Sequence, residues 1–138
     1  MSKITLTIPG KPFGKQMPRS TRTGINYTPK ETKSYMNLIK MCYIEKYGND
    51  APFLEGALFM NINAYFDIPK SISKKKRLLM LSNEIRPTKK PDSKNILAGA
   101  EDALEGLCYQ NDSHIVEHNL YKWYAEKPRV EIEVKEIR

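Results

Sequence analysis

The stretch LFMNINAYFDIP, residues 58–69, carries the signal that decides the fold. Apolar side chains occupy every second position of its first nine residues, which predicts a β-strand with one buried face. Asp67 to Pro69 then turn the chain out of the strand. A strand with one apolar face needs a second layer packed on it, so we expect helices to cover a sheet. The alternating residues are Leu58, Met60, Ile62, Ala64 and Phe66.

Three other segments also have the alternation of strands. Ile4, Leu6 and Ile8 alternate with threonines before Pro9-Gly10 stops the strand, and two more strands are expected over residues 115–124 and 129–137. The sequence AEKP, residues 125–128, joins the last two and predicts a hairpin connection between them.

Three segments have helical spacing instead. The first runs over residues 31–47 and ends at Gly48, and the second, SISKKKRLLMLS, is a short basic helix capped by Ser71 or Ser73. The third lies within KKPDSKNILAGAEDALEG, residues 89–106. Strands and helices mix without a regular βαβ repeat, so the predicted class is α+β, a single mixed, partly antiparallel sheet with about three helices packed on it. The predicted buried faces are Tyr35, Leu38, Ile39, Cys42 and Tyr43 on the first helix, and Ile96, Ala100, Ala103, Leu104 and Leu107 on the third.

The size and composition of the chain indicate one ordinary domain. Its 138 residues are enough to bury a core without disulfides, so we expect a single domain over residues 1–138. The apolar runs are too short to span a bilayer, and MSKITLTIPG lacks the features of a secretory signal, so a cytoplasmic protein is expected. Cys42 and Cys108 have no metal-site spacing, and we predict two buried free thiols.

The charge of the chain favours a polyanionic partner. Lys and Arg number 23 against 16 Asp and Glu, which gives a net charge of +7. The segment KPFGKQMPRSTRTGINYTPK, residues 11–30, is predicted to be an extended cationic loop that contacts phosphates and stacks on bases. The alternative is a solvated loop, which explains the charge but not its coincidence with so many prolines and glycines. The second basic cluster, residues 74–77, is interpreted as a solvated helix face. The cations in and just after the loop are Lys11, Lys15, Arg19, Arg22, Lys30 and Lys33, interleaved with Phe13 and Tyr27.

Two acidic residues are candidate metal ligands. Asp92 precedes a predicted helix and Asp112 lies in the turn before a strand, and Mg²⁺ prefers carboxylates, phosphate oxygens and water. Each has a structural alternative, because Asp92 suits an N-cap and Asn111-Asp112 suits a turn. Asp102 lies ten residues beyond Asp92 on one helix, about 15 Å away, so these two cannot share an ion. His114 and His118 are interpreted as packing or surface residues, and no Walker loop, GxSxG or HExxH is present.

Several weak motifs in order give the chain a family resemblance. They are the PR-containing loop at residues 15–19, YTPKETKSY, KKPD…N…DALEG, YQNDSHIVE and KPRVEIEV. In this order they resemble the RusA family of Holliday junction resolvases, small dimeric endodeoxyribonucleases typical of phages and prophages. The resemblance covers nearly the whole chain and implies a RusA-like fold.

The resemblance also implies a site. The family's acidic motif D-x-D-N-x-x-K places its first Asp at Asp92 and its Asn at Asn95, and the later acidic pair falls on Asn111 and Asp112. Mg²⁺ or Mn²⁺ would be held by Asp92 and Asp112, with Asn95 and Asn111 in support and no small-molecule cofactor. This chain departs from the motif at Lys94, which replaces the second Asp, and at Ala98, which replaces the Lys. Lys94 would place its ammonium near the scissile phosphate.

The expected function is therefore a homodimeric, metal-dependent endonuclease that resolves four-way junctions by paired nicks in recombination and repair. The catalytic residues would be Asp92, Asp112 and Lys94. An alternative is a catalytically silent protein of the same fold that binds branched DNA, and a weaker one is a generic basic protein whose acids are only caps and turns. The residues expected to bind DNA are Lys15, Arg19, Arg22, Lys30 and Lys33.

Overall fold

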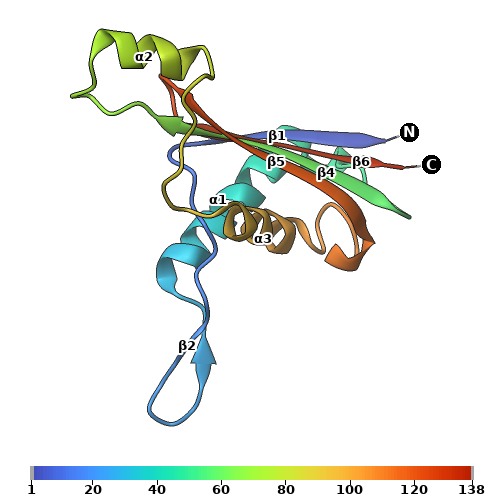
Figure 1. The fold of residues 1–138 in the computed structure, drawn as a ribbon. Coiled ribbons are helices and arrows are strands. Elements are labelled where there is room, and N and C mark those ends of the chain that lie inside the picture. The colour runs from blue at the N-terminus through green and yellow to red at the C-terminus, as the bar shows by residue number, and fades with distance from the viewer. Residues whose placement is uncertain (1, 138) are drawn as a thin grey trace.

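The computed structural model describes residues 2–137 and has the α+β architecture expected from the sequence (Figure 1). A four-stranded sheet has the strand order β1-β6-β4-β5. Its strands are β1 (Lys3–Pro9), β4 (Leu58–Asp67), β5 (Ile115–Ala125) and β6 (Arg129–Glu136). The helices are α1 (Lys30–Tyr47), α2 (Lys74–Leu81) and α3 (Ser93–Leu104), with the short 3-10 helices η1 (Gly48–Asp50) and η2 (Asp112–His114).

Strand β4 lies inside the sheet and confirms the alternation that predicted it. Its residues are buried and half-buried in strict turn from Leu58 onward. It pairs antiparallel with β6, where Ile62 faces Ile132, and parallel with β5, where Ile62 faces Leu120. The mixed sheet is therefore confirmed.

The predicted hairpin between the last two strands is wrong. Residues 125–128 do join β5 to β6, but β4 lies between those strands. The reason is burial: β4 has a completely buried face and takes an interior position, whereas residues 116–119 of β5 are exposed and lie at the edge of the sheet. Three of these four residues, Glu117, His118 and Asn119, are polar, and exposed polar residues are tolerated on an edge strand.

Helices α1 and α3 pack on one face of the sheet and enclose the core (Figure 1). Ile39 and Tyr43 of α1 are fully buried, but Tyr35, Leu38 and Cys42 are only partly buried. The prediction of two buried thiols is therefore wrong for Cys42 and correct for Cys108. On α3 the predicted face is buried as far as Leu104, and Leu107, beyond the helix, is partly buried.

The helix ends follow local signals in the sequence. Gly48 ends α1 with φ 56°, a conformation that favours glycine. Of the two candidate caps of α2, Ser73 is the one used, and its side chain accepts a hydrogen bond from the Lys76 N–H. Among residues 2–137, no helix combines the length and the apolar character needed to cross a membrane.

The cationic segment of residues 11–30 is more ordered than predicted. Its second half forms a small antiparallel hairpin, β2 (Arg19–Ser20) with β3 (Asn26–Tyr27), which projects from the body of the protein (Figure 1). The Thr21 N–H donates to the Ile25 carbonyl across its turn, so part of the predicted extended loop is a regular hairpin.

Candidate metal centre and nucleic-acid interface

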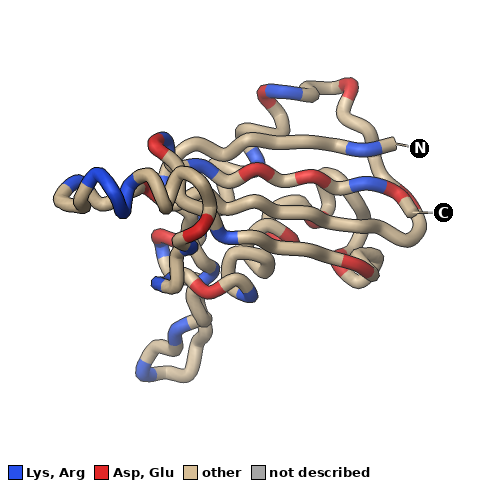
Figure 2. The backbone as a smooth tube through the Cα atoms, turned by 45° about the horizontal axis from the view of Figure 1, so that its top comes forward, with Lys and Arg blue, Asp and Glu red and all other residues tan. Residues whose placement is uncertain are grey.

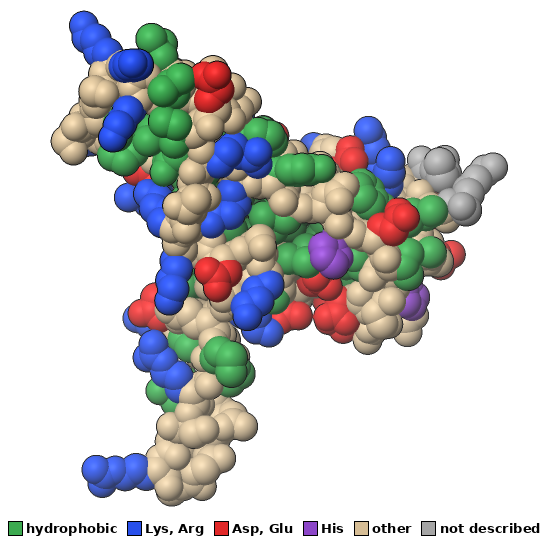
Figure 3. Space-filling model, in the orientation of Figure 1, with side chains coloured by type: hydrophobic (Ala, Val, Ile, Leu, Met, Phe, Trp, Pro, Cys, Tyr) green, Lys and Arg blue, Asp and Glu red, His purple; other side chains and the backbone are tan. Residues whose placement is uncertain are grey.

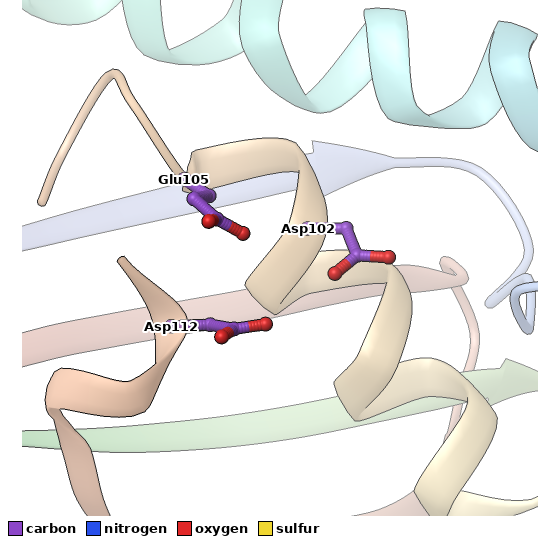
Figure 4. Close-up of side chains that lie close together, drawn as sticks. All are labelled: Asp102, Glu105 and Asp112. Carbon is purple, nitrogen blue, oxygen red and sulfur yellow. The ribbon is translucent and has the colours of Figure 1, made fainter. Parts of the chain in front are cut away.

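Three carboxylates meet at the C-terminal end of α3 (Figure 4). Asp102 lies in the last turn of α3, Glu105 follows the helix directly, and Asp112 begins η2. One oxygen of each side chain lies within 4.8 Å of the others, and all three residues are partly buried. We call Asp102, Glu105 and Asp112 the acidic cluster.

A tight reversal of the chain after α3 builds this cluster. Gly106 has φ 83°, and its N–H donates to the Tyr109 carbonyl at 2.7 Å. Tyr109 is fully buried, and its hydroxyl donates to the Glu101 carbonyl at 2.6 Å, which fixes the returning segment against α3. The chain then reaches Asn111, whose side chain accepts a hydrogen bond from Ser113 N–H at 2.9 Å and holds the turn that presents Asp112.

Burial and neighbouring charges both act on Glu101, which lies beside the acidic cluster. The pKa of Glu101 is raised, mainly by burial and then by the nearby charge of Asp112, with His118 acting in the opposite direction. Lys15 forms an ion pair with Asp102. The Lys15 backbone N–H also donates to the Asn95 carbonyl at 2.9 Å, so this cation is held against α3 at two points.

Residues 11–17 pass very close to the start of α3. A Cβ added to Gly14 would lie 2.8 Å from Cβ of Pro91 and 3.0 Å from Cβ of Asn95, so only glycine allows this approach. Further along, the Gln16 N–H donates to the hydroxyl of Thr32, a fully buried residue of α1. The segment therefore bridges both helices and positions Lys15.

Asp92 lies at the other end of α3. It has the backbone geometry of an N-cap, and its carbonyl accepts from Ile96 N–H, but its side chain makes no capping hydrogen bond. The exposed carboxylate is thus available for another partner. Asp92, Lys15 and Asn95 are among the residues lining one pocket of about 500 Å³. Burial lowers the pKa of the neighbouring Lys122, and the charge of Asp92 opposes that shift.

The structure thus groups the predicted site residues in two places. Asp112 joins the acidic cluster, whereas Asp92 and Asn95 share the pocket at the start of α3, and Lys15 contacts both places. Lys94 is exposed in the first turn of α3. Sequence reasoning missed Asp102 and Glu105 as neighbours of Asp112; the signal was Gly106, which allows the chain to return on the helix end.

The other predicted DNA-binding residues lie on exposed surface. Arg19 and Arg22 are on the projecting hairpin and its turn, and Lys30 and Lys33 are exposed in the first turn of α1. Figure 2 shows basic positions on this hairpin and on α2, at the side of the molecule away from the labelled chain ends. Lys15 differs from these cations because it is partly buried and already paired.

Comparison with known proteins identifies the family of this chain. Residues 9–135 match the family described as endodeoxyribonuclease RusA. The chain belongs to the RusA family. A curated relative, the uncharacterized protein YqaN of Bacillus subtilis (strain 168), is 33% identical over 140 residues, with 99% of each chain covered. Membership confirms the resemblance inferred from the motifs, and the RusA family implies the hydrolase class of an endodeoxyribonuclease.

The acidic cluster fits the metal that the RusA family requires. Its three ligand side chains all offer carboxylate oxygens, the type of ligand that Mg²⁺ and Mn²⁺ prefer, and no thiol or imidazole is among them. Because the three side chains are only partly buried, there is also room for water and for a phosphate oxygen of the substrate. Mg²⁺ retains several waters and binds substrate phosphates beside one or two carboxylates.

Proposed function

We propose that this RusA-family protein is a metal-dependent, structure-selective endodeoxyribonuclease that resolves four-way DNA junctions. The observation that carries the proposal is the position of Asp112, which the family motif marks as a ligand and which lies among carboxylates beside Lys15. The fold, the donor set and the adjacent cations all support phosphodiester hydrolysis.

The acidic cluster would hold Mg²⁺ or Mn²⁺ through Asp102, Glu105 and Asp112. When bound, such an ion lowers the pKa of a coordinated water and polarises the phosphate. Asp92 stays a predicted ligand, supported by its uncapped, exposed carboxylate and by its place in the pocket with Asn95. The two assignments differ in which single substitution abolishes cleavage.

Lys15 has a second role in this proposal. In the structure its ammonium neutralises Asp102. Once a cation neutralises that carboxylate instead, Lys15 is free to donate to a phosphate of the DNA backbone. Lys94, exposed two residues after Asp92, would stabilise charge that develops on the scissile phosphate.

The remaining cations would bind the DNA backbone. Arg19 and Arg22 would do so from the hairpin, and Lys30 and Lys33 from the start of α1. We further propose a homodimer, because two sites related by a two-fold axis match the symmetry of a four-way junction and can nick two strands in pairs.

The test uses a synthetic mobile four-way junction and linear duplex, each with Mg²⁺, with Mn²⁺ and with chelator, and products are resolved on a denaturing gel. Wild type should make paired, metal-dependent nicks in the junction alone. Asp112→Asn should abolish them, and Asp50→Asn, an exposed acid in η1, is the matched control that should cut normally. An Asp112→Asn protein that cleaves as fast as wild type would overturn the site.

The same gel separates the two ligand assignments. Loss of cleavage in Asp102→Asn with activity kept in Asp92→Asn places the ion in the acidic cluster, and the reverse pattern places it at the start of α3. Sedimentation of the free protein tests the dimer, which a single monomeric species would exclude.

A second candidate function is junction binding without cleavage. Lys94 and Ala98 favour it, because they replace an acid and a lysine of the family motif. It predicts tight, salt-sensitive junction binding with no nicks in either metal, whereas the nuclease requires both binding and metal-dependent products.

A further inference from the structure

Helix α2 begins with three lysines that no acidic residue of the described chain neutralises. Lys74, Lys75 and Lys76 are exposed, and none of them forms an ion pair within residues 2–137. The helix contains no acidic residue, and only the next cation, Arg77, is paired, with Glu126 at 3.1 Å. Adjacent like charges repel one another, and a polyanion bound there would relieve that repulsion.

The same helix exposes apolar side chains beside these cations. Leu78 is 66% exposed and Leu81 is 40% exposed. Leu78 lies four residues after Lys74 and three after Lys75, so these three side chains share one face of the helix. Figure 3 shows hydrophobic and basic side chains side by side on α2, at the top of that view.

Helix α2 is held firmly enough to act as a fixed arm. Its own Met80 side chain is buried, and Ser73 caps its first turn. After the helix, Asn83 takes a positive φ of 68°, and the backbone N–H groups of Glu84 and Ile85 both donate to the Leu79 carbonyl. The exposed face therefore belongs to an ordered element.

Positive charge continues from α2 toward the start of α3. The guanidinium of Arg86 stacks 3.7 Å from the Trp123 ring centroid and donates to the Lys122 carbonyl at 2.6 Å. The Lys122 ammonium in turn donates to the Lys89 carbonyl at 2.6 Å. Figure 3 shows basic side chains along this side of the molecule, from α2 at the top to the β2–β3 hairpin at the bottom.

We propose that α2 is a second DNA-contacting arm, which binds one duplex arm of a branched substrate while the β2–β3 hairpin binds another. Lys74, Lys75 and Lys76 would contact phosphates, and Leu78 and Leu81 would pack against sugars and the unstacked bases of the branch point. This inference rests on the proposed function and deepens it. Charge complementarity and continuity with the cations around Asp92 select DNA as the partner.

The first test compares two variants that lose the same charge. Lys74→Gln/Lys75→Gln removes two cations from α2, and Lys3→Gln/Lys135→Gln removes two from neighbouring β1 and β6 positions at the end of the sheet away from α2. Equilibrium binding to the junction is measured in chelator over 50–200 mM salt. The α2 variant should lower the slope of log affinity against log salt by about 1.8, so its deficit should be roughly 10-fold larger at 50 than at 200 mM. The control should keep the wild-type slope; an α2 variant that does the same overturns the proposal.

The second test concerns the leucines. Leu78→Ser/Leu81→Ser should keep the salt slope but lose several-fold of the preference for junction over linear duplex, and 2-aminopurine at the branch point should brighten less than with wild type. Circular dichroism checks that the variant is folded. Unchanged DNA binding together with an altered sedimentation coefficient would assign the leucine face to a protein contact and overturn this part of the proposal.

Failure of this inference is distinct from failure of the proposed function. The binding measurements exclude metal, so they are independent of cleavage. If both α2 variants bind like wild type while wild type cuts junctions, α2 is not a DNA arm and the nuclease stands. A wild type that neither prefers junctions nor cuts them contradicts both.

Discussion

Gly14→Ala should destabilise the protein by placing one methyl group between two elements that cannot separate easily. The added Cβ would lie 2.8 Å from Cβ of Pro91 and 3.0 Å from Cβ of Asn95. Neither atom is the end of a flexible side chain, since one belongs to a ring and the other is attached directly to the backbone of α3. Residues 11–17 or the start of α3 must therefore move. Overpacking of this kind costs about 1–3 kcal/mol.

Gly99→Ala is the matched control, because it adds the same methyl group to the other side of the same contact. Its nearest neighbours would be Cβ and N of Lys15, at 3.7 and 3.8 Å, which are ordinary contact distances. Alanine is also favoured over glycine inside a helix by about 0.5–1 kcal/mol. The two substitutions should therefore change stability in opposite directions.

Urea unfolding measures both effects as shifts of the midpoint at constant m value. Gly14→Ala should also lower the melting temperature by roughly 4–12 °C for a domain of this size. Because Lys15 follows Gly14 and pairs with Asp102, junction cleavage should fall as well. A Gly14→Ala protein as stable as wild type, or a Gly99→Ala protein destabilised by about 1 kcal/mol or more, would refute the described packing of residues 11–17 on α3.

Three further predictions concern the acidic cluster and its support. Lys15→Met should bind Mn²⁺ about 10-fold more tightly by calorimetry, because a lysine beside the cluster opposes a bound cation by ~1–2 kcal/mol at partial exposure. The same variant should bind junction DNA less tightly. Weaker Mn²⁺ binding than wild type would contradict this prediction. The raised pKa of Glu101 means that its contribution to stability is complete below the unfolded pKa and is lost as pH rises through the folded one. Glu101→Gln should therefore gain stability over wild type at pH 7 and much less at pH 4 in urea melts, and an equal gain at both values would exclude burial of this carboxyl. Tyr109→Phe removes the hydroxyl that donates to the Glu101 carbonyl and should lower the free energy of unfolding by about 1 kcal/mol in the same assay. Tyr121→Phe, at an exposed position, is the neutral control. A Tyr109→Phe protein as stable as wild type would show that this hydrogen bond does not fix the segment.

The elements of the fold were predictable where a local period sets them. The alternation from Leu58 to Phe66 and the helical spacing before Gly48 and before Gly106 need no knowledge of distant residues. The strand order was not predictable in this way. Residues 125–128 form a connection of the same length whether or not their strands pair, and β4 takes its place between them because of how much apolar surface it buries.

The candidate site shows the same division between local and distant information. The motif order predicts Asp112 and Lys15 as site residues. Spacing along α3 separates Asp102 from Asp92, and it gives no information about the chain reversal at Gly106. The residue type of Asp92 predicted a capping side chain, yet the structure leaves that carboxylate free of the cap. The chain reversal after α3 brings Asp112 beside Asp102 and Glu105. That reversal depends on the burial of Tyr109, a residue far less local than the helical period.

The place of β6 constrains how the protein is made. β1 and β4 each pair with β6 and not with each other, so the sheet is in two pieces until this strand, the last of the four in chain order, has left the ribosome. Before that moment β1 and β4 are not joined in one sheet, so the apolar faces of these strands are exposed to chaperones and to other chains. Folding is then completed by one late, long-range event that joins both halves of the core at once.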